Sequence, residues 1–174
     1  MKHLIKKSLC YISTLLLCGC HSDSTGDIPA VDNFNAGKYM GDWYEIARLP
    51  NYFEKDLQCV TANYTLLPSG RIMVRNCGVK DNIRRCITGE AKLRGEADKG
   101  ELLVSFQWPF YGAYRIIYLN DDYSVAMVTG SRKKYFWILS RTPKLPVGEL
   151  EKLIHWAKTH GYETEKLIYP LPLH

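Results

Sequence analysis

The residue types that most often perform catalysis are scattered along this sequence, without the spacing that catalysis needs. Two of the five histidines lie on one predicted helix, but His155 and His160 do not share a helix face. No Gly-x-Ser-x-Gly, His-Glu-x-x-His or P-loop pattern occurs. Glu45 is predicted to face the inside of a sheet, where we expect a structural ion pair or hydrogen bond rather than catalysis. The sequence therefore predicts no enzyme and no cofactor.

A cysteine near the start of the chain carries a more specific chemical signal. Three lysines precede the apolar run 9–17, which is far shorter than the ~20 residues of a membrane-spanning helix and is typical of an export signal. The run ends in Leu17-Cys18-Gly19-Cys20, which resembles a bacterial lipobox. This makes residues 1–19 the predicted signal peptide and Cys20 the predicted lipidation site. An ordinary secretion signal that ends in a chance cysteine is the alternative, since Cys18 stands where Ala or Ser is commoner.

The residues after the lipobox indicate where the protein would be held. His21 rather than Asp follows Cys20, and similarity to lipoprotein sorting in Gram-negative bacteria implies the outer membrane. Residues 20–36 are polar and are predicted to be a lipidated tether, in which about 15 flexible residues would reach roughly 20 Å. Of the 23 basic residues three lie in the signal, which leaves 20 against 18 acidic residues. This near-neutral balance gives no reason to expect a nucleic-acid partner.

The body of the chain, residues 37–174, is predicted to be one all-β domain. Its strand-like segments span 42–48, 58–67, 70–79, 83–94, 101–107, 113–119, 123–130 and 134–141. Their spacing is typical of an all-β barrel or sandwich. One helix is predicted over 149–160, because Leu150, Leu153, Ile154 and Ala157 form an apolar stripe. We expect this stripe to pack against the outside of the sheet.

Apolar side chains alternate with polar ones along several segments, so that one face of the sheet is apolar. The residues on this face include Val60, Ala62, Tyr64, Ile72, Val74, Tyr135 and Trp137. A closed eight-stranded barrel with this face inside can hold one small ligand. The alternative is that the same side chains pack against each other and leave no cavity, and alternation alone does not separate the two.

Four longer stretches identify a family. Gly41-Asp42-Trp43 resembles the Gly-x-Trp signature of the lipocalins, and its context agrees: WYEIARLPNYFE, CVTANYTLLPSGRIMVRN, VSFQWPFYGAYRIIYL and YFWILSRTP. Together these resemble bacterial lipocalins, outer-membrane lipoproteins similar to apolipoprotein D. The resemblance covers roughly residues 35 to 170 and implies an eight-stranded antiparallel up-and-down barrel with a C-terminal helix on its outside. It also implies that Trp43 closes the base of the barrel and that Arg141 packs across it.

The resemblance further implies a hydrophobic ligand, a fatty acid or a lysophospholipid. The predicted ligand contacts are Val60, Ala62, Tyr64, Ile72, Val74, Arg115, Ile117, Tyr135 and Trp137. Arg115 and Ile117 lie on the odd side of AYRIIYL, which we align with the inward side. We expect Arg115 to meet a phosphate or carboxylate, with a solvated arginine as the alternative.

The cysteines of the body are predicted to form a disulfide rather than a metal site. The spacing of Cys59, Cys77 and Cys86 is poor for zinc. Cys59 and Cys77 lie nine residues on either side of Pro68, which places them opposite each other on adjacent strands, and the compartment is oxidising. This predicts a Cys59–Cys77 bridge, and leaves Cys86 either buried and free or competing for Cys77.

These observations predict a lipid-anchored carrier that faces the periplasm. Its partners would be a fatty acid or lysophospholipid and, through the anchor, a membrane; a homodimer is compatible with the sequence. Two alternatives are an enzyme that acts on a bound lipid and an envelope interaction module with a filled core.

Overall fold

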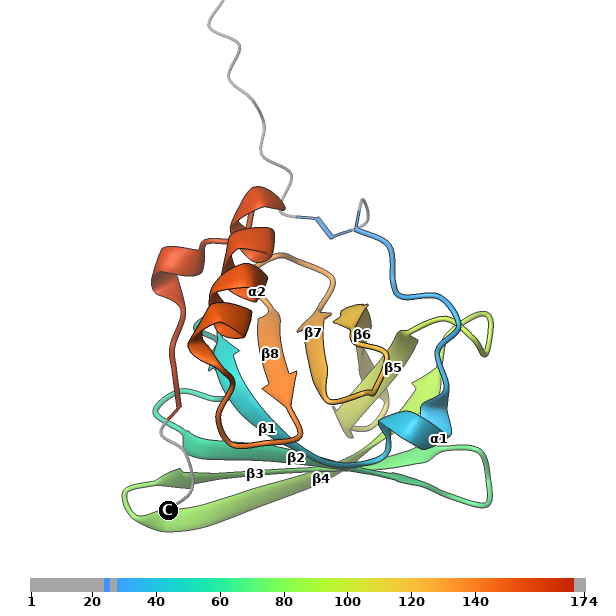
Figure 1. Cartoon of the computed structure of the whole chain (residues 1–174). Helices are drawn as coiled ribbons and strands as arrows, with labels where there is room; N and C mark the ends of the chain where they lie inside the picture. Colours follow the sequence, from blue (N-terminus) through green and yellow to red (C-terminus); the bar gives the residue numbers. More distant parts are fainter. Residues whose placement is uncertain (1–23, 26–27, 171–174) are drawn as a thin grey trace, which may run out of the picture.

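The computed structural model describes residues 24–25 and 28–170, which form a closed antiparallel barrel of eight strands. The strands are β1 (Gly41–Arg48), β2 (Gln58–Leu66), β3 (Ile72–Lys80), β4 (Ile83–Leu93), β5 (Glu101–Gln107), β6 (Phe110–Leu119), β7 (Val125–Thr129) and β8 (Phe136–Ser140). Each strand pairs with its neighbours in sequence, and β1 also pairs with β8. Helix α2 (Val147–Thr159) lies on the outside of this barrel (Figure 1). The predicted fold class is confirmed.

The up-and-down order of the strands gives the barrel two different ends. The connections β1–β2, β3–β4, β5–β6 and β7–β8 share one end, which we call the open end. The connections β2–β3, β4–β5 and β6–β7 share the other, which we call the closed end. The short helix α1 (Ala36–Tyr39) directly precedes β1 at this closed end (Figure 1).

Two hydrophobic clusters lie on the two sides of the barrel wall. Trp43, Tyr64, Ile72 and Ile116 belong to the cluster inside the barrel. A second cluster joins Ala47, Ile117, Val125, Phe136 and Ile138 of the wall to Leu153 and Ala157 of α2. Because successive side chains of a strand point to opposite faces, neighbours such as Ile116 and Ile117 contribute to different clusters. The apolar stripe of the helix therefore covers the outer wall, as the sequence predicts.

The segment before α1 is held against the barrel, although the sequence assigns residues 20–36 to a tether. Ile28 and Phe34 are buried, and the Val31 N–H donates to the Ile116 carbonyl at 2.9 Å. At the open end the Thr25 hydroxyl donates to the Gly130 carbonyl at 2.7 Å. Residues 28–36 are thus part of the domain, because apolar side chains at 28, 31 and 34 anchor a stretch whose overall composition is polar.

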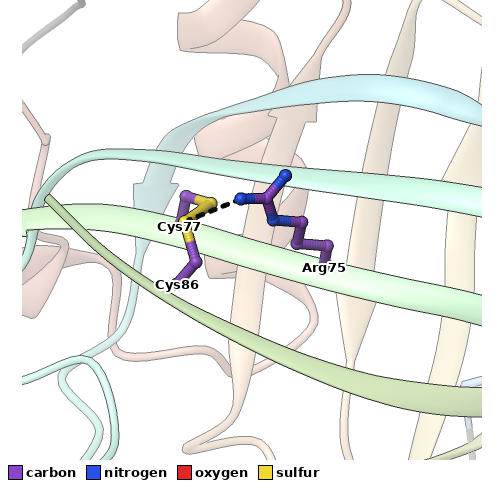
Figure 2. The surroundings of a disulfide bond; sticks show 3 residues. All are labelled: Arg75, Cys77 and Cys86. Carbon is purple, nitrogen blue, oxygen red and sulfur yellow. Dashed lines mark hydrogen bonds between the residues drawn. A yellow bond between two sulfur atoms is a disulfide. The ribbon is translucent and has the colours of Figure 1, made fainter.

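The disulfide joins Cys77 to Cys86, and the predicted Cys59–Cys77 bridge is wrong (Figure 2). The β2–β3 ladder is centred on Ser69 rather than Pro68, so Thr61 and not Cys59 lies opposite Cys77. Cys59 itself lies in the register shift between Gln58 and Thr61, where the direct pairing of the β2–β3 ladder is interrupted. Cys77 and Cys86 are direct partners in the β3–β4 ladder, which brings their side chains together.

Replacing Cys77 and Cys86 by serine should lower the free energy of unfolding by about 2–3 kcal/mol, because the bridge closes a short loop in the unfolded chain. Urea unfolding of the mature chain measures this change. Non-reducing peptide mapping should find Cys77 linked to Cys86 in the parent and in the Cys59→Ser control. A linked peptide that contains Cys59 would contradict the pairing.

Candidate ligand-binding site at the open end of the barrel

Arg141 and Trp43 seal the closed end. The Arg141 guanidinium carbon lies 3.9 Å from the centroid of the Trp43 ring, and Trp43 is fully buried. The guanidinium also donates hydrogen bonds to the backbone carbonyls of Lys38, Tyr39, Met40, Asp42 and Tyr123. A planar group with five donors suits this arrangement. One side chain therefore ties α1, the start of β1 and the β6–β7 connection into a stopper.

Replacing Arg141 by lysine should destabilise the fold even though the charge is kept. The ammonium cannot reach the same set of carbonyls, and hydrogen bonds from a charged donor contribute about 1.5–3 kcal/mol each. We expect a loss of roughly 2–4 kcal/mol in urea unfolding, together with a changed near-ultraviolet circular dichroism signal. The exposed Lys144→Ala is the control. An Arg141→Lys variant as stable as the parent would refute this account of the stopper.

Three tyrosines occupy the interior above the stopper. The Tyr114 hydroxyl lies 2.7 Å from that of Tyr39 and 2.9 Å from that of Tyr64. Burial raises the pKa of Tyr64 to about 12 and that of Tyr39 well above its ordinary value, so both stay neutral. Their rings pack on one another at a centroid distance of 5.4 Å. Hydroxyls that satisfy each other in this way are tolerated in an apolar core.

Five of the predicted ligand contacts lie on the inner face, at Val60, Ala62, Tyr64, Ile72 and Val74, and all are buried. Four of them belong to the inner cluster with Trp43 and Tyr39. They therefore pack largely against other side chains of the protein. The half of the interior next to the stopper is filled, so space for a ligand has to be sought toward the open end.

Tyr135 and Trp137, also predicted contacts, lie at the open end beside the β1–β2 connection. Their rings stack with an interplanar angle of 6°, and the Phe53 ring stacks on both. The Trp137 indole N–H donates to the Glu54 carboxylate at 2.8 Å. These aromatic side chains form one wall of the opening, and Phe53 was not expected from the sequence.

Arg115 and Ile117 point outward, and their prediction as ligand contacts is wrong. Arg115 donates to the carbonyls of Thr25 and Ile28, while Ile117 belongs to the cluster under α2. The inward residues of β6 are the even ones, Tyr114 and Ile116. The error came from aligning the alternation of AYRIIYL with the wrong face, which a shift of one residue reverses completely.

A buried group of charges lies inside the barrel near the open end. Arg48 donates to the Glu45 carboxylate at 2.5 Å and to the carbonyls of Glu54 and Leu57. Its Nε lies 4.0 Å from the Glu54 carboxylate. One guanidinium thus faces two carboxylates, both in buried residues. Glu45 has a structural hydrogen bond, one of the two contacts expected for it, and the sequence did not reveal its partner Arg48 or its acidic neighbour Glu54.

This group contains two carboxyl groups and only one guanidinium, and this imbalance contributes to the raised pKa of Glu45. Burial, and secondarily the charge of Glu54, raises the pKa of Glu45 from 4.5 to about 8, against the opposing effect of Arg48. The contact with Arg48 favours the charged form, but one cation cannot neutralise two buried anions. We therefore assign a neutral Glu45 to the folded protein at pH 7.

The folded chain accordingly keeps a proton on Glu45 that the unfolded chain releases, so stability falls as the pH rises from about 4.5 toward about 8. Glu45→Gln should remove this slope. Its free energy of unfolding relative to the parent should rise by up to about 1.4 kcal/mol per pH unit in that window. Urea unfolding across pH measures the difference, with the exposed Glu151→Gln as control. A difference that does not change with pH would disprove the assignment.

A hollow of about 330 Å³ opens in the wall where β4 and β5 separate. Pairing between the two strands extends only to Glu90 and Ser105. The hollow is lined by Thr88, Gly89, Glu90, Ser105, Phe106 and Trp108. A Cβ at Gly89 would lie 2.2 Å from the Ser105 carbonyl oxygen, so glycine is what allows β5 to cross β4 this closely. The hollow is shallow and largely open to solvent.

The inner face of β4 beside this hollow is uncovered. Ile87 shares a face with Gly89 and with Ala91 of the inner cluster, yet it is 51% exposed. Arg85 lies one step further along the same face and is also exposed. The sequence analysis singled out none of these residues, although the aromatic run around the turn at Pro109 was a signal that could have drawn attention to this end.

Within residues 24–25 and 28–170, no group of three or more His, Cys, Asp or Glu side chains could hold a metal ion. None of the helices in the same residues is long and apolar enough to cross a membrane. The predicted lipidation site, Cys20, and the signal peptide lie outside the described residues.

Known proteins share this sequence and architecture. A family model described as a lipocalin-like domain matches residues 34–172. The chain is 39% identical over 162 residues to the outer membrane lipoprotein Blc of Vibrio cholerae, a match that covers 91% of this chain and 94% of that protein. It is 32% identical over 148 residues to mouse apolipoprotein D, covering 80% and 77% of the two chains.

A solved structure agrees in fold. Insecticyanin of the tobacco hornworm Manduca sexta superposes with a TM-score of 0.68 at 20% identity, covering 83% of this chain and 84% of that one. A closed up-and-down barrel with an arginine-capped tryptophan at one end and an apolar opening at the other defines a class of ligand-binding barrels. The chain belongs to the lipocalin family.

Proposed function

We propose that this protein binds a single-chain acyl lipid, a fatty acid or a lysophospholipid, at the open end of its barrel. The observation that carries the proposal is the exposure of apolar side chains at the hollow: Phe106 and Trp108, which line it, and Ile87 on β4 nearby remain exposed among the described residues. Each CH₂ group buried there would contribute about 0.8 kcal/mol. An acyl chain is long, narrow and apolar enough to use such a cleft.

The polar end of the lipid needs a different contact from the Arg115 that the sequence suggested. Arg85 lies on the same face as Ile87 and would place a guanidinium beside the carboxylate or phosphate of a lipid whose chain lies in the hollow. Arginine suits both groups because it offers a planar fork of donors. We therefore assign the headgroup contact to Arg85.

The proposal includes a lipid anchor at Cys20 and a place at the outer membrane. Support comes from the lipobox and from the similarity to proteins named outer membrane lipoprotein Blc. An anchored lipocalin that faces the periplasm would store or carry envelope lipids without chemical change. The family consists generally of non-catalytic binding proteins.

Ile87→Asp should weaken the binding of palmitate to the mature chain by roughly tenfold or more, because a carboxylate replaces apolar contact and repels the ligand. Isothermal titration or displacement of a fluorescent fatty acid measures the affinity. Val147→Asp, at an exposed apolar position on α2, is the control. Arg85→Ala should weaken palmitate but not its uncharged monoglyceride. Equal palmitate affinity in Ile87→Asp and the parent would overturn the proposal.

One observation favours a second candidate, an envelope interaction module with a filled core. The inner cluster around Trp43, Tyr39 and Tyr64 fills the half of the barrel next to the stopper. Organic extraction of the purified protein followed by lipid mass spectrometry separates the two functions. A carrier should release acyl lipid in proportion to protein, whereas a filled module should release none and should not bind palmitate.

A further inference from the structure

The open end of the barrel carries a group of exposed aromatic and aliphatic side chains, of which only Trp108 lines the hollow. Tyr52 is 92% exposed, Trp108 79% and Phe110 71%, and Phe53 and Ile83 are also exposed. They lie in or directly after the connections β1–β2, β3–β4 and β5–β6, which the up-and-down topology places at one end. We call these five residues the apolar rim. Exposed apolar groups of this size mark interaction surfaces.

Basic residues accompany the apolar rim. The open-end segments 49–57, 80–85, 107–110 and 130–135 contain seven Lys or Arg and three Asp or Glu, and one of the acids, Glu54, is buried. Lys55 and Arg84 are exposed beside Phe53 and Ile83. Aromatic side chains mixed with basic ones suit the interface of an anionic bilayer, where rings sit at headgroup level and cations meet phosphates.

The start of the described chain lies at the same end. Ser24 forms a β-bridge with Arg132 in the β7–β8 connection, and Thr25 is buried there against Gly130. From residue 28 the chain runs down the outside of the barrel to α1 (Figure 1). Cys20 precedes Ser24 by four residues, which span at most about 14 Å. An acyl anchor at Cys20, as in the proposed function, would tie the membrane to the open end.

We infer that the open end docks onto an anionic phospholipid bilayer through the apolar rim and its basic neighbours, so that the mouth of the barrel faces the membrane. The basic residues beside the apolar rim favour an anionic bilayer over a second copy of the chain, because two positively charged surfaces repel each other. The docking surface shares Trp108 with the hollow, whereas Tyr52, Ile83 and Phe110 do not line the hollow. Docking and ligand binding can therefore be tested independently.

The test uses the mature chain without its lipid, residues 21–174, which retains every described element. Flotation with vesicles of equimolar phosphatidylethanolamine and phosphatidylglycerol measures binding. Replacing Tyr52, Ile83 and Phe110 together by serine should lower the partition coefficient roughly tenfold or more. The control replaces Leu66, Leu67 and Val147, exposed apolar residues away from the open end, and should bind as the parent does. Circular dichroism melting verifies that both variants are folded.

A charge pair of variants tests the electrostatic part. Lys55→Glu with Arg84→Glu should weaken binding by at least an order of magnitude, since each basic residue near an anionic surface contributes roughly a fivefold factor. Lys144→Glu with Lys152→Glu, both exposed and away from the rim, is the control. Binding of the parent should also fall on pure phosphatidylcholine and at high salt.

Two results would overturn the inference. One is equal flotation of the rim variants and the parent, or an equal loss in the controls. The other is that the rim variants change the molecular mass in sedimentation velocity but not the flotation, which would make the rim a contact between two copies. Palmitate affinity is measured in parallel: a rim variant that loses flotation but keeps palmitate binding supports docking, whatever the fate of the proposed ligand.

Discussion

The pairing of β1 with β8 is the constraint on which the rest of the structure depends. It runs from Tyr44–Ser140 to Arg48–Trp137 and removes both edges from the sheet. Closure also gives every strand an inside and an outside, which is why one set of alternating side chains builds the inner cluster and the other set receives α2. The strand at this seam carries Trp43, Glu45 and Arg48, so it contributes to both the stopper and the buried charges.

The two ends of the interior are lined differently, by aromatic rings near the stopper and by buried charged groups toward the open end. Near the stopper, aromatic rings pack together and the hydroxyls of Tyr39 and Tyr64 each form a hydrogen bond with that of Tyr114. Toward the open end the lining changes to a guanidinium between two carboxylates. Such a group is tolerable there because protonation of Glu45 removes the unpaired charge. The filled half gives rigidity, and the other half keeps apolar surface exposed beside a hollow.

The sequence predicted the features that depend on period and local turn chemistry. The strand segments, a helix over 149–160 and the inward face of β2 and β3 follow from alternation and spacing, whereas the up-and-down order was implied by the resemblance to the lipocalins. The failures arose where one residue of register matters. Moving the centre of the β2–β3 hairpin from Pro68 to Ser69 replaced Cys59 by Thr61 opposite Cys77. Choosing the wrong parity in β6 turned Arg115 and Ile117 inward.

Other features could not be predicted because they depend on contacts between distant segments. The stretch GDWYEIAR alone does not show that Arg48 will contact both Glu45 and Glu54. Glu54 lies in the β1–β2 connection, outside this stretch. The polar composition of residues 20–36 likewise hid Ile28, Val31 and Phe34, which hold residues 28–36 to the barrel. Composition predicts a tether well only when no partner surface is available, and here Gly100 and Ile116 supply hydrogen-bond partners for Val31.

The position of the hollow at the open end has a kinetic consequence if that end meets a bilayer. An acyl chain that crosses water exposes its methylenes at about 0.8 kcal/mol each, which is on the order of 10 kcal/mol for a palmitoyl chain. A mouth in contact with the membrane removes most of this cost, because the chain passes from one apolar environment to another. The separation of β4 from β5 beyond Glu90–Ser105 is then as useful as the hollow itself. It opens the wall where Ile87, Phe106 and Trp108 can receive the chain before its headgroup leaves the interface.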